Sequence, residues 1–123
     1  MSNLSFFDNP DEAPLPRDQV AIEHVTFEPY ADGRRVRVSI TLTPFLDRPN
    51  LDISLLTPEG RPVSSLSIVE ALERHMDFTL HLRERELLPQ YIGRVELYYE
   101  EGQVQDTFEV PLNIRPSDGQ STE

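Results

Sequence analysis

Apolar and polar residues alternate along much of this chain, and a period of two is typical of β-strands with one buried face. The clearest example is the segment 35–43, in which every second residue is apolar and the residues between are polar. Its apolar positions are Val36, Val38, Ile40 and Leu42. Because a strand places successive side chains on opposite faces, this segment is expected to bury one face and expose the other.

Six further segments have a strand-like composition, and stretches rich in Gly, Pro, Asn and Asp separate most of them. The seven predicted strands are residues 20–27, 35–43, 51–56, 62–69, 75–82, 91–99 and 104–114. Short strands at this spacing are typical of an antiparallel sandwich or barrel. The last strand contains Pro111, which has no N–H to donate, so this strand is expected at a sheet edge or with a bulge. The alternation predicts one core, formed by Val36, Val38, Ile40, Leu42, Leu51, Ile53, Phe78, Leu80, Leu82, Val95, Leu97, Phe108, Val110 and Leu112.

Two segments fit the strand pattern poorly. In residues 67–75, Ser67 precedes Glu70 by three positions, as in a helix capping box. We therefore expect the strand to run into this segment and then to give way to a helical turn. Residues 83–90 also favour a turn of helix, which is expected to end before Pro89.

One stretch carries a resemblance to a known class of fold. The sequence LLPQYIGRVELYY, residues 87–99, resembles the corner before the sixth strand, and that strand, in immunoglobulin-like and fibronectin type III-like sandwiches. Such folds often carry a Tyr there whose hydroxyl bonds back to the corner, and Tyr91 is in the matching position. The chain lacks the Cys pair and the Trp of antibody-type domains. The resemblance implies an all-β, antiparallel, seven-stranded immunoglobulin-like β-sandwich, and it implies no chemistry, because such folds host many unrelated functions.

The chain has 123 residues, no Cys and a net charge of -11. The absence of Cys excludes disulfides, thiolate catalysis and Cys-based zinc sites. A surface this acidic repels phosphate groups. Neither nucleic acid nor a membrane is therefore an expected partner. The predicted organisation is a disordered, acidic, proline-rich arm over residues 1–19, the sandwich domain over 20–114 and a disordered tail over 115–123. The start, MSNLSFFDNPDEA, lacks the features of a secretory signal, and a cytoplasmic location is expected.

The histidines are the first candidates for a metal or catalytic site. His75, Asp77 and His81 occupy alternate positions of one predicted strand. In a strand the two histidines lie about 20 Å apart, whereas ligand atoms must lie within about 2.1 Å of a shared ion. The positions between them are apolar, so the three polar residues are expected on the solvent-facing side. We therefore assign no catalytic residue, no metal ligand and no cofactor.

The basic cluster Arg34, Arg35 and Arg37 has two possible roles. The cluster could bind an anion, or it could pair with neighbouring Glu side chains, and pairing is the expected outcome. The sequence contains no glycine-rich phosphate loop, no nucleophile elbow and no EF-hand-type calcium loop.

The residues Phe6 and Phe7 give the one sequence-specific sign of a partner. They lie in an acidic, proline-rich stretch that cannot bury them. They are expected either to dock into a groove of another protein, as short linear motifs do, or to fold back over a sheet edge of their own domain. The expected function is a non-enzymatic interaction or scaffold module with a protein partner. The alternative is an accessory or regulatory domain that binds a small ligand or cation through acidic loops.

Overall fold

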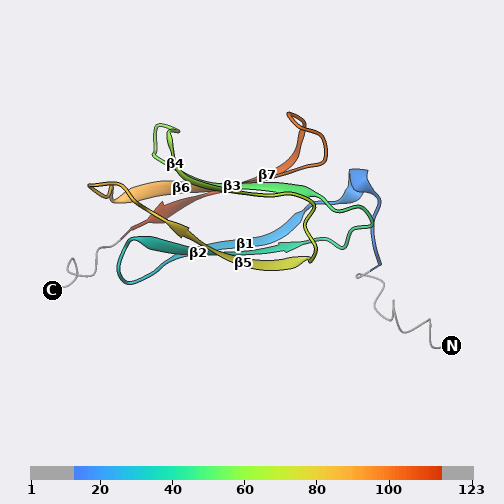
Figure 1. Cartoon of the computed structure of the whole chain (residues 1–123), viewed down its shortest axis with the longest axis horizontal. Helices are drawn as coiled ribbons and strands as arrows, with labels where there is room; N and C mark the ends of the chain where they lie inside the picture. Colours follow the sequence, from blue (N-terminus) through green and yellow to red (C-terminus); the bar gives the residue numbers. More distant parts are fainter. Residues whose placement is uncertain (1–12, 115–123) are drawn as a thin grey trace.

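Seven strands make up nearly all the regular structure in the computed structural model, which describes residues 13–114 (Figure 1). The strands are β1 (Ile22–Pro29), β2 (Arg35–Leu42), β3 (Asn50–Leu56), β4 (Pro62–Ile68), β5 (His75–His81), β6 (Gln90–Tyr98) and β7 (Val104–Asn113), and the short 3-10 helix η3 (Arg17–Gln19) precedes them. Their ends differ from the predicted ends by at most two residues. In this part of the chain no helix is long and apolar enough to cross a membrane.

The strands form two sheets that pack face to face (Figure 1). One sheet has the order β1-β2-β5 and the other the order β4-β3-β6-β7, and all neighbouring strands are antiparallel. The predicted seven-stranded antiparallel β-sandwich is thus confirmed. In constant-type immunoglobulin domains the fourth strand lies with the first, second and fifth, whereas here β4 pairs with β3. As a result, residues 69–74 must cross from one sheet to the other.

The core lies between the sheets and is built from alternate residues of each strand. Across β3 and β6, for example, the fully buried Ile53 and Val95 are paired. Eleven of the fourteen predicted core residues are buried; the other three, Phe78, Phe108 and Val110, are half-buried on the edge strands β5 and β7. The core also contains six residues that were not predicted: Val20, Val25, Phe27, Leu55, Tyr91 and Ile114.

The position of the last strand agrees with the prediction from Pro111. This residue lies opposite Ile92 on β7, which is an edge strand of the four-stranded sheet. An edge strand can accept a proline because one side of its backbone has no partner strand.

The folded part of the chain begins earlier than the predicted boundary at residue 20. Leu15 forms an isolated parallel bridge with Phe45, and its backbone N–H donates to the carbonyl of Pro44 at 3.3 Å. The N–H of Leu46 in turn donates to the carbonyl of Leu15 at 3.0 Å. Residues 13–19, assigned above to the disordered arm, therefore belong to the structured domain. Residues 1–12 and 115–123 lie outside the described part of the chain.

The helical turn predicted within residues 67–75 is wrong, because the groups that would cap it are used elsewhere. The hydroxyl of Ser67 donates to the carboxylate of Asp52 on the neighbouring strand at 2.7 Å. The backbone N–H of Glu70 donates to the Asn50 side chain at 2.8 Å, and Glu70 adopts a positive φ of 55°. The strand ends at Ile68, and an irregular connection follows.

The helical turn predicted within residues 83–90 is wrong for a similar reason. In an α-helix the N–H of Leu88 would donate to the carbonyl of Glu84. Instead it donates to the hydroxyl of Tyr91 at 2.9 Å, and the Glu84 carbonyl accepts a hydrogen bond from the Arg34 guanidinium. The donor and the acceptor of this helical hydrogen bond, the Leu88 N–H and the Glu84 carbonyl, are therefore both bonded to other groups.

Candidate functional site

The most distinctive surface feature is the side of the sandwich between the edge strands β4 and β5. The connection 69–74 crosses this side and is fixed at both ends. Near its start, the N–H of Glu70 donates to the Asn50 side chain, and the next residue, Ala71, is buried and donates its N–H to the carbonyl of Pro49 at 2.8 Å. At its end, the carbonyl of Arg74 accepts from the N–H of Leu42 at 2.9 Å, and the Arg74 guanidinium donates back to the Leu42 carbonyl. These hydrogen bonds hold the connection against both sheets, so that it forms one side of the surface described next.

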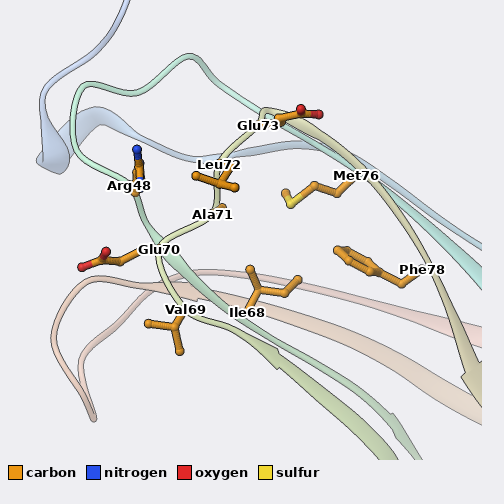
Figure 2. Close-up of a pocket in the computed structure, with 9 residues that line it drawn as sticks. All are labelled: Arg48, Ile68, Val69, Glu70, Ala71, Leu72, Glu73, Met76 and Phe78. Carbon is orange, nitrogen blue, oxygen red and sulfur yellow. The ribbon is translucent and has the colours of Figure 1, made fainter.

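Beside this connection lies a pocket of about 500 Å³, which we call the β4–β5 pocket (Figure 2). Ile68 at the end of β4, Met76 and Phe78 of β5, and Leu72 of the connection point toward one another in it. Arg48, Glu70 and Glu73 lie around its rim, and the two carboxylates point away from the apolar side chains. A volume of this size falls in the range of sites that hold a ligand or a large side chain.

The pocket exposes apolar side chains that the domain itself does not cover. Leu72 and Val69 are each 73% exposed, and Met76 and Phe78 remain half-buried. The cause is topological. Met76 and Phe78 face inward on β5, but β4 and β5 are edge strands of different sheets, and no further strand of the described chain closes the gap. Apolar surface gathered in this way, with a polar rim, is typical of an interaction site.

A second, polar hollow of about 290 Å³ adjoins the first. It shares Arg48 and Glu70 with the β4–β5 pocket and is otherwise lined by Arg17, Leu46 and Asp47. Arg17 lies in η3 and pairs with Asp47 at 3.0 Å. The hollow therefore connects the N-terminal segment of the described chain with the pocket.

The edge of β4 beside the pocket is unprotected. Native edge strands are usually shielded by charged residues, prolines or bulges. Among the four edge strands of the described sandwich, β1, β5 and β7 each carry acidic residues, and β7 also contains Pro111 within the strand. Strand β4 has the sequence PVSSLSI, with no charge and with proline only at its first position. Its outer backbone groups are open to a further strand.

The predicted metal candidates lie elsewhere, on the outer face of the three-stranded sheet. His75, Asp77 and His81 are all exposed, and the structure pairs them with β2 and not with one another. His75 Nδ1 lies 3.1 Å from the Thr41 hydroxyl, and Asp77 accepts from the Ser39 hydroxyl at 2.5 Å. Within residues 13–114 no three or more His, Cys, Asp or Glu side chains are grouped so that they could hold a metal ion.

The electrostatics of this face are set by pairs across the strands. The hydroxyl of Ser39, and also the guanidinium of Arg37 at 3.6 Å, lower the pKa of the Asp77 carboxyl, against an opposing effect of desolvation. Of the other two arginines of the basic cluster, Arg35 pairs with Asp32 at 2.9 Å, and Arg34 donates to the backbone carbonyls of residues 84 and 85. The expected pairing takes place, but with Asp and main-chain groups and not with Glu side chains.

Two further residues singled out by the sequence have different outcomes. Tyr91 is fully buried, and its hydroxyl is the acceptor for the Leu88 N–H described above, at the start of β6. Phe6 and Phe7 lie outside the described residues.

The β4–β5 pocket was not predicted. Its one trace in the sequence is that the segment 67–75 fits the strand pattern poorly.

Comparisons with known proteins identify relatives of the fold only. The sequence matches no family model and no curated protein sequence. Among solved structures, the fold is similar to part of a Bifidobacterium dentium β-glucuronidase complexed with coumarin-3-O-glucuronide, with a TM-score of 0.64 and 19% identity over 80% of this chain and 18% of that one. It is also similar to part of a putative β-galactosidase from Bacteroides fragilis, with a TM-score of 0.58 and 16% identity over 79% of this chain and 18% of that one. A glycosyl hydrolase family 2 member from Bacteroides cellulosilyticus gives a TM-score of 0.57 and 17% identity over 78% of this chain and 14% of that one. This chain thus spans less than a fifth of each of these proteins.

Proposed function

We propose that this domain is a non-enzymatic interaction module, and that it binds a partner polypeptide on the open side of the sandwich between β4 and β5. The observation that carries the proposal is the β4–β5 pocket, in which Val69 and Leu72 are largely exposed above a half-buried apolar floor. The partner's chemistry follows from the pocket and from the neighbouring edge. It is an extended segment that adds to β4 through its backbone and places one large apolar side chain in the pocket.

The comparisons support a role without catalysis. The similar region occupies 14–18% of each glycosidase chain, which is the share of a single domain. We propose that this chain is a domain of similar extent and that it works by contact with another polypeptide. The partner is a larger protein or a further domain, and no glycosidase activity is carried over to this chain, because a shared sandwich fold hosts many functions.

We further propose that the sandwich is of the immunoglobulin-like kind. The corner made by Tyr91 and the backbone of Leu88 supports this, since it matches the tyrosine corner of those folds. The placement of β4 beside β3 distinguishes the chain from constant-type immunoglobulin domains.

A selection of displayed random peptides on the full-length protein tests the proposed function. Selected peptides are expected to contain a large apolar residue and to bind Leu72→Asp at least about tenfold more weakly, a change of about 1.4 kcal/mol in binding free energy. The matched control is Val104→Asp, because Val104 is also an exposed apolar residue, 47% exposed, but lies at the start of β7. Peptides that bind Leu72→Asp as tightly as the unaltered protein would refute the docking site.

A further inference from the structure

We infer that the β4–β5 pocket is occupied by the chain's own N-terminal segment, with Phe6 or Phe7 in the apolar part, so that a partner must displace this segment. The inference rests on the proposed function, since it needs a pocket that accepts a large apolar side chain. It identifies the resident ligand of that site and makes the N-terminal segment a regulator of access.

The place where the described chain begins supports this assignment. Residues 13–19 lie at the same end of the sandwich as the connection 69–74, whereas β7 ends at the opposite end (Figure 1). Arg17 lines the polar hollow, which shares Arg48 and Glu70 with the pocket. The N-terminal segment is therefore the part of the chain outside the described residues that starts beside the pocket.

The length of the segment is sufficient. Five residues lie between Phe7 and Ala13, and the six Cα–Cα steps that join them span at most about 20 Å when the chain is extended. The pocket shares Arg48 and Glu70 with the hollow that Arg17 lines, so the segment has to pass only this one hollow to bring a phenylalanine ring to the pocket. A tether this short also holds the ring at an effective concentration in the millimolar range, which favours binding within one chain over binding between chains.

The acidic residues between Phe7 and Ala13, together with the basic Arg48 on the rim of the pocket, favour the same occupant. Asp8, Asp11 and Glu12 follow the phenylalanines and precede Ala13. Arg48 lies on the rim of both hollows, is exposed, and makes no ion pair with any other residue of the described part of the chain. Its guanidinium can donate to one of these carboxylates, while the rim carboxylates of Glu70 and Glu73 point away from the apolar side chains of the pocket (Figure 2).

A single tryptophan provides the test, because the chain has no Trp of its own. In full-length Phe7→Trp the emission is expected to be blue-shifted and protected from a soluble quencher. Adding Leu72→Asp should shift it back to that of a solvent-exposed indole, and circular dichroism should show an intact fold, since Leu72 is 73% exposed. The matched control is Ser2→Trp, whose indole is expected to be solvent-exposed in both backgrounds. The blue shift should not vary over a wide range of protein concentration.

Three outcomes would overturn the inference. A blue shift that grows with concentration would show that a second copy supplies the ring. A blue shift that Leu72→Asp leaves unchanged would place the ring elsewhere. An indole of Phe7→Trp that is solvent-exposed from the outset would show that the pocket is not occupied in this way. In the last case, full-length Phe6→Ser/Phe7→Ser separates the two proposals: if it still binds a phenylalanine-containing peptide in a Leu72-dependent manner, the docking site stands and only its resident ligand is refuted.

Discussion

The ring of Phe27 on β1 lies directly against Gly93 on β6, across the interface between the two sheets. A methyl group added at Gly93 would approach three carbons of this ring to 2.8 Å. Phe27 is 9% exposed and belongs to the buried core, so the ring has little room to move. The absence of a side chain at position 93 is thus what allows a phenylalanine to fill this part of the sandwich.

Gly93→Ala is therefore expected to destabilise the domain. Replacing a strand glycine by alanine usually stabilises by about 0.4–1 kcal/mol, because it restricts the unfolded chain. Overpacking a filled core costs about 1–3 kcal/mol, and contacts of 2.8 Å with a confined ring make this the larger effect. We expect a net loss of about 1–2 kcal/mol in the free energy of unfolding, measured by denaturant titration.

The matched test combines this change with Phe27→Leu. Once the ring is gone, Gly93→Ala should be neutral or stabilising, which gives a coupling energy of at least about 1 kcal/mol in a double-mutant cycle. Additive losses in the double variant would show that the two residues do not oppose each other as described.

The second prediction concerns the corner before β6. Tyr91→Phe keeps the buried ring but leaves the half-buried N–H of Leu88 without its acceptor, and should cost about 0.5–1.5 kcal/mol. Tyr30→Phe is the control, because the ring of Tyr30 stacks under the Arg35 guanidinium and its hydroxyl bonds to no residue in the described range. Equal losses in the two variants, in matched denaturant titrations, would contradict a specific role for the Tyr91 hydroxyl.

Strand alternation was enough to predict the sandwich, and the reason is local. In β2, Val36, Val38 and Ile40 are all fully buried or nearly so, as their period of two requires. A strand buried on one face imposes that period whatever its neighbours are. The two predicted helical turns are absent because side chains accept the backbone N–H groups in their place. The distant Asn50 accepts from the N–H of Glu70, and Tyr91, three residues along the chain, accepts from that of Leu88.

The β4–β5 pocket could not be predicted from the sequence because it depends on which sheet β4 joins. If β4 paired with β5, Met76 and Phe78 would lie beside a neighbouring strand and Leu72 would belong to a tight turn. Because β4 pairs with β3, those side chains lie at an open side. Strand β4 lies between β3 and β5 in the sequence, and the apolar pattern of these strands does not say which of the two it pairs with.

The third prediction concerns acid stability. The Ser39 hydroxyl and the Arg37 guanidinium lower the pKa of Asp77 in the folded protein below the ordinary value of 3.8. A carboxyl whose pKa is lower in the folded state stabilises that state above the ordinary pKa, and the contribution is lost as the pH falls through the folded value. The melting temperature of Asp77→Asn should therefore be lower than that of the unaltered protein near neutral pH.

This difference should shrink as the pH falls below about 3.8. Ser39→Ala, which removes the largest cause of the lowered pKa, should change the melting temperature in the same direction and over the same pH range. A difference between Asp77→Asn and the unaltered protein that is constant from neutral pH to well below 3.8 would show that the ionised carboxylate is not responsible.

The last prediction follows the increase in burial from the mouth of the β4–β5 pocket into the core. Leu72 is 73% exposed, Phe78 is half-buried and Leu80 is 3% exposed. Because the cost of truncation follows the apolar surface that is buried, Leu72→Ala should change the free energy of unfolding by less than about 0.5 kcal/mol. Phe78→Ala should cost about 1–3 kcal/mol, less than for a fully buried ring, and Leu80→Ala about 2–5 kcal/mol. Measuring all three in the Phe6→Ser/Phe7→Ser background removes any contribution of the N-terminal segment. A loss at Leu72 as large as that at Leu80 would mean that the domain itself covers the pocket, and would leave no open surface for a partner.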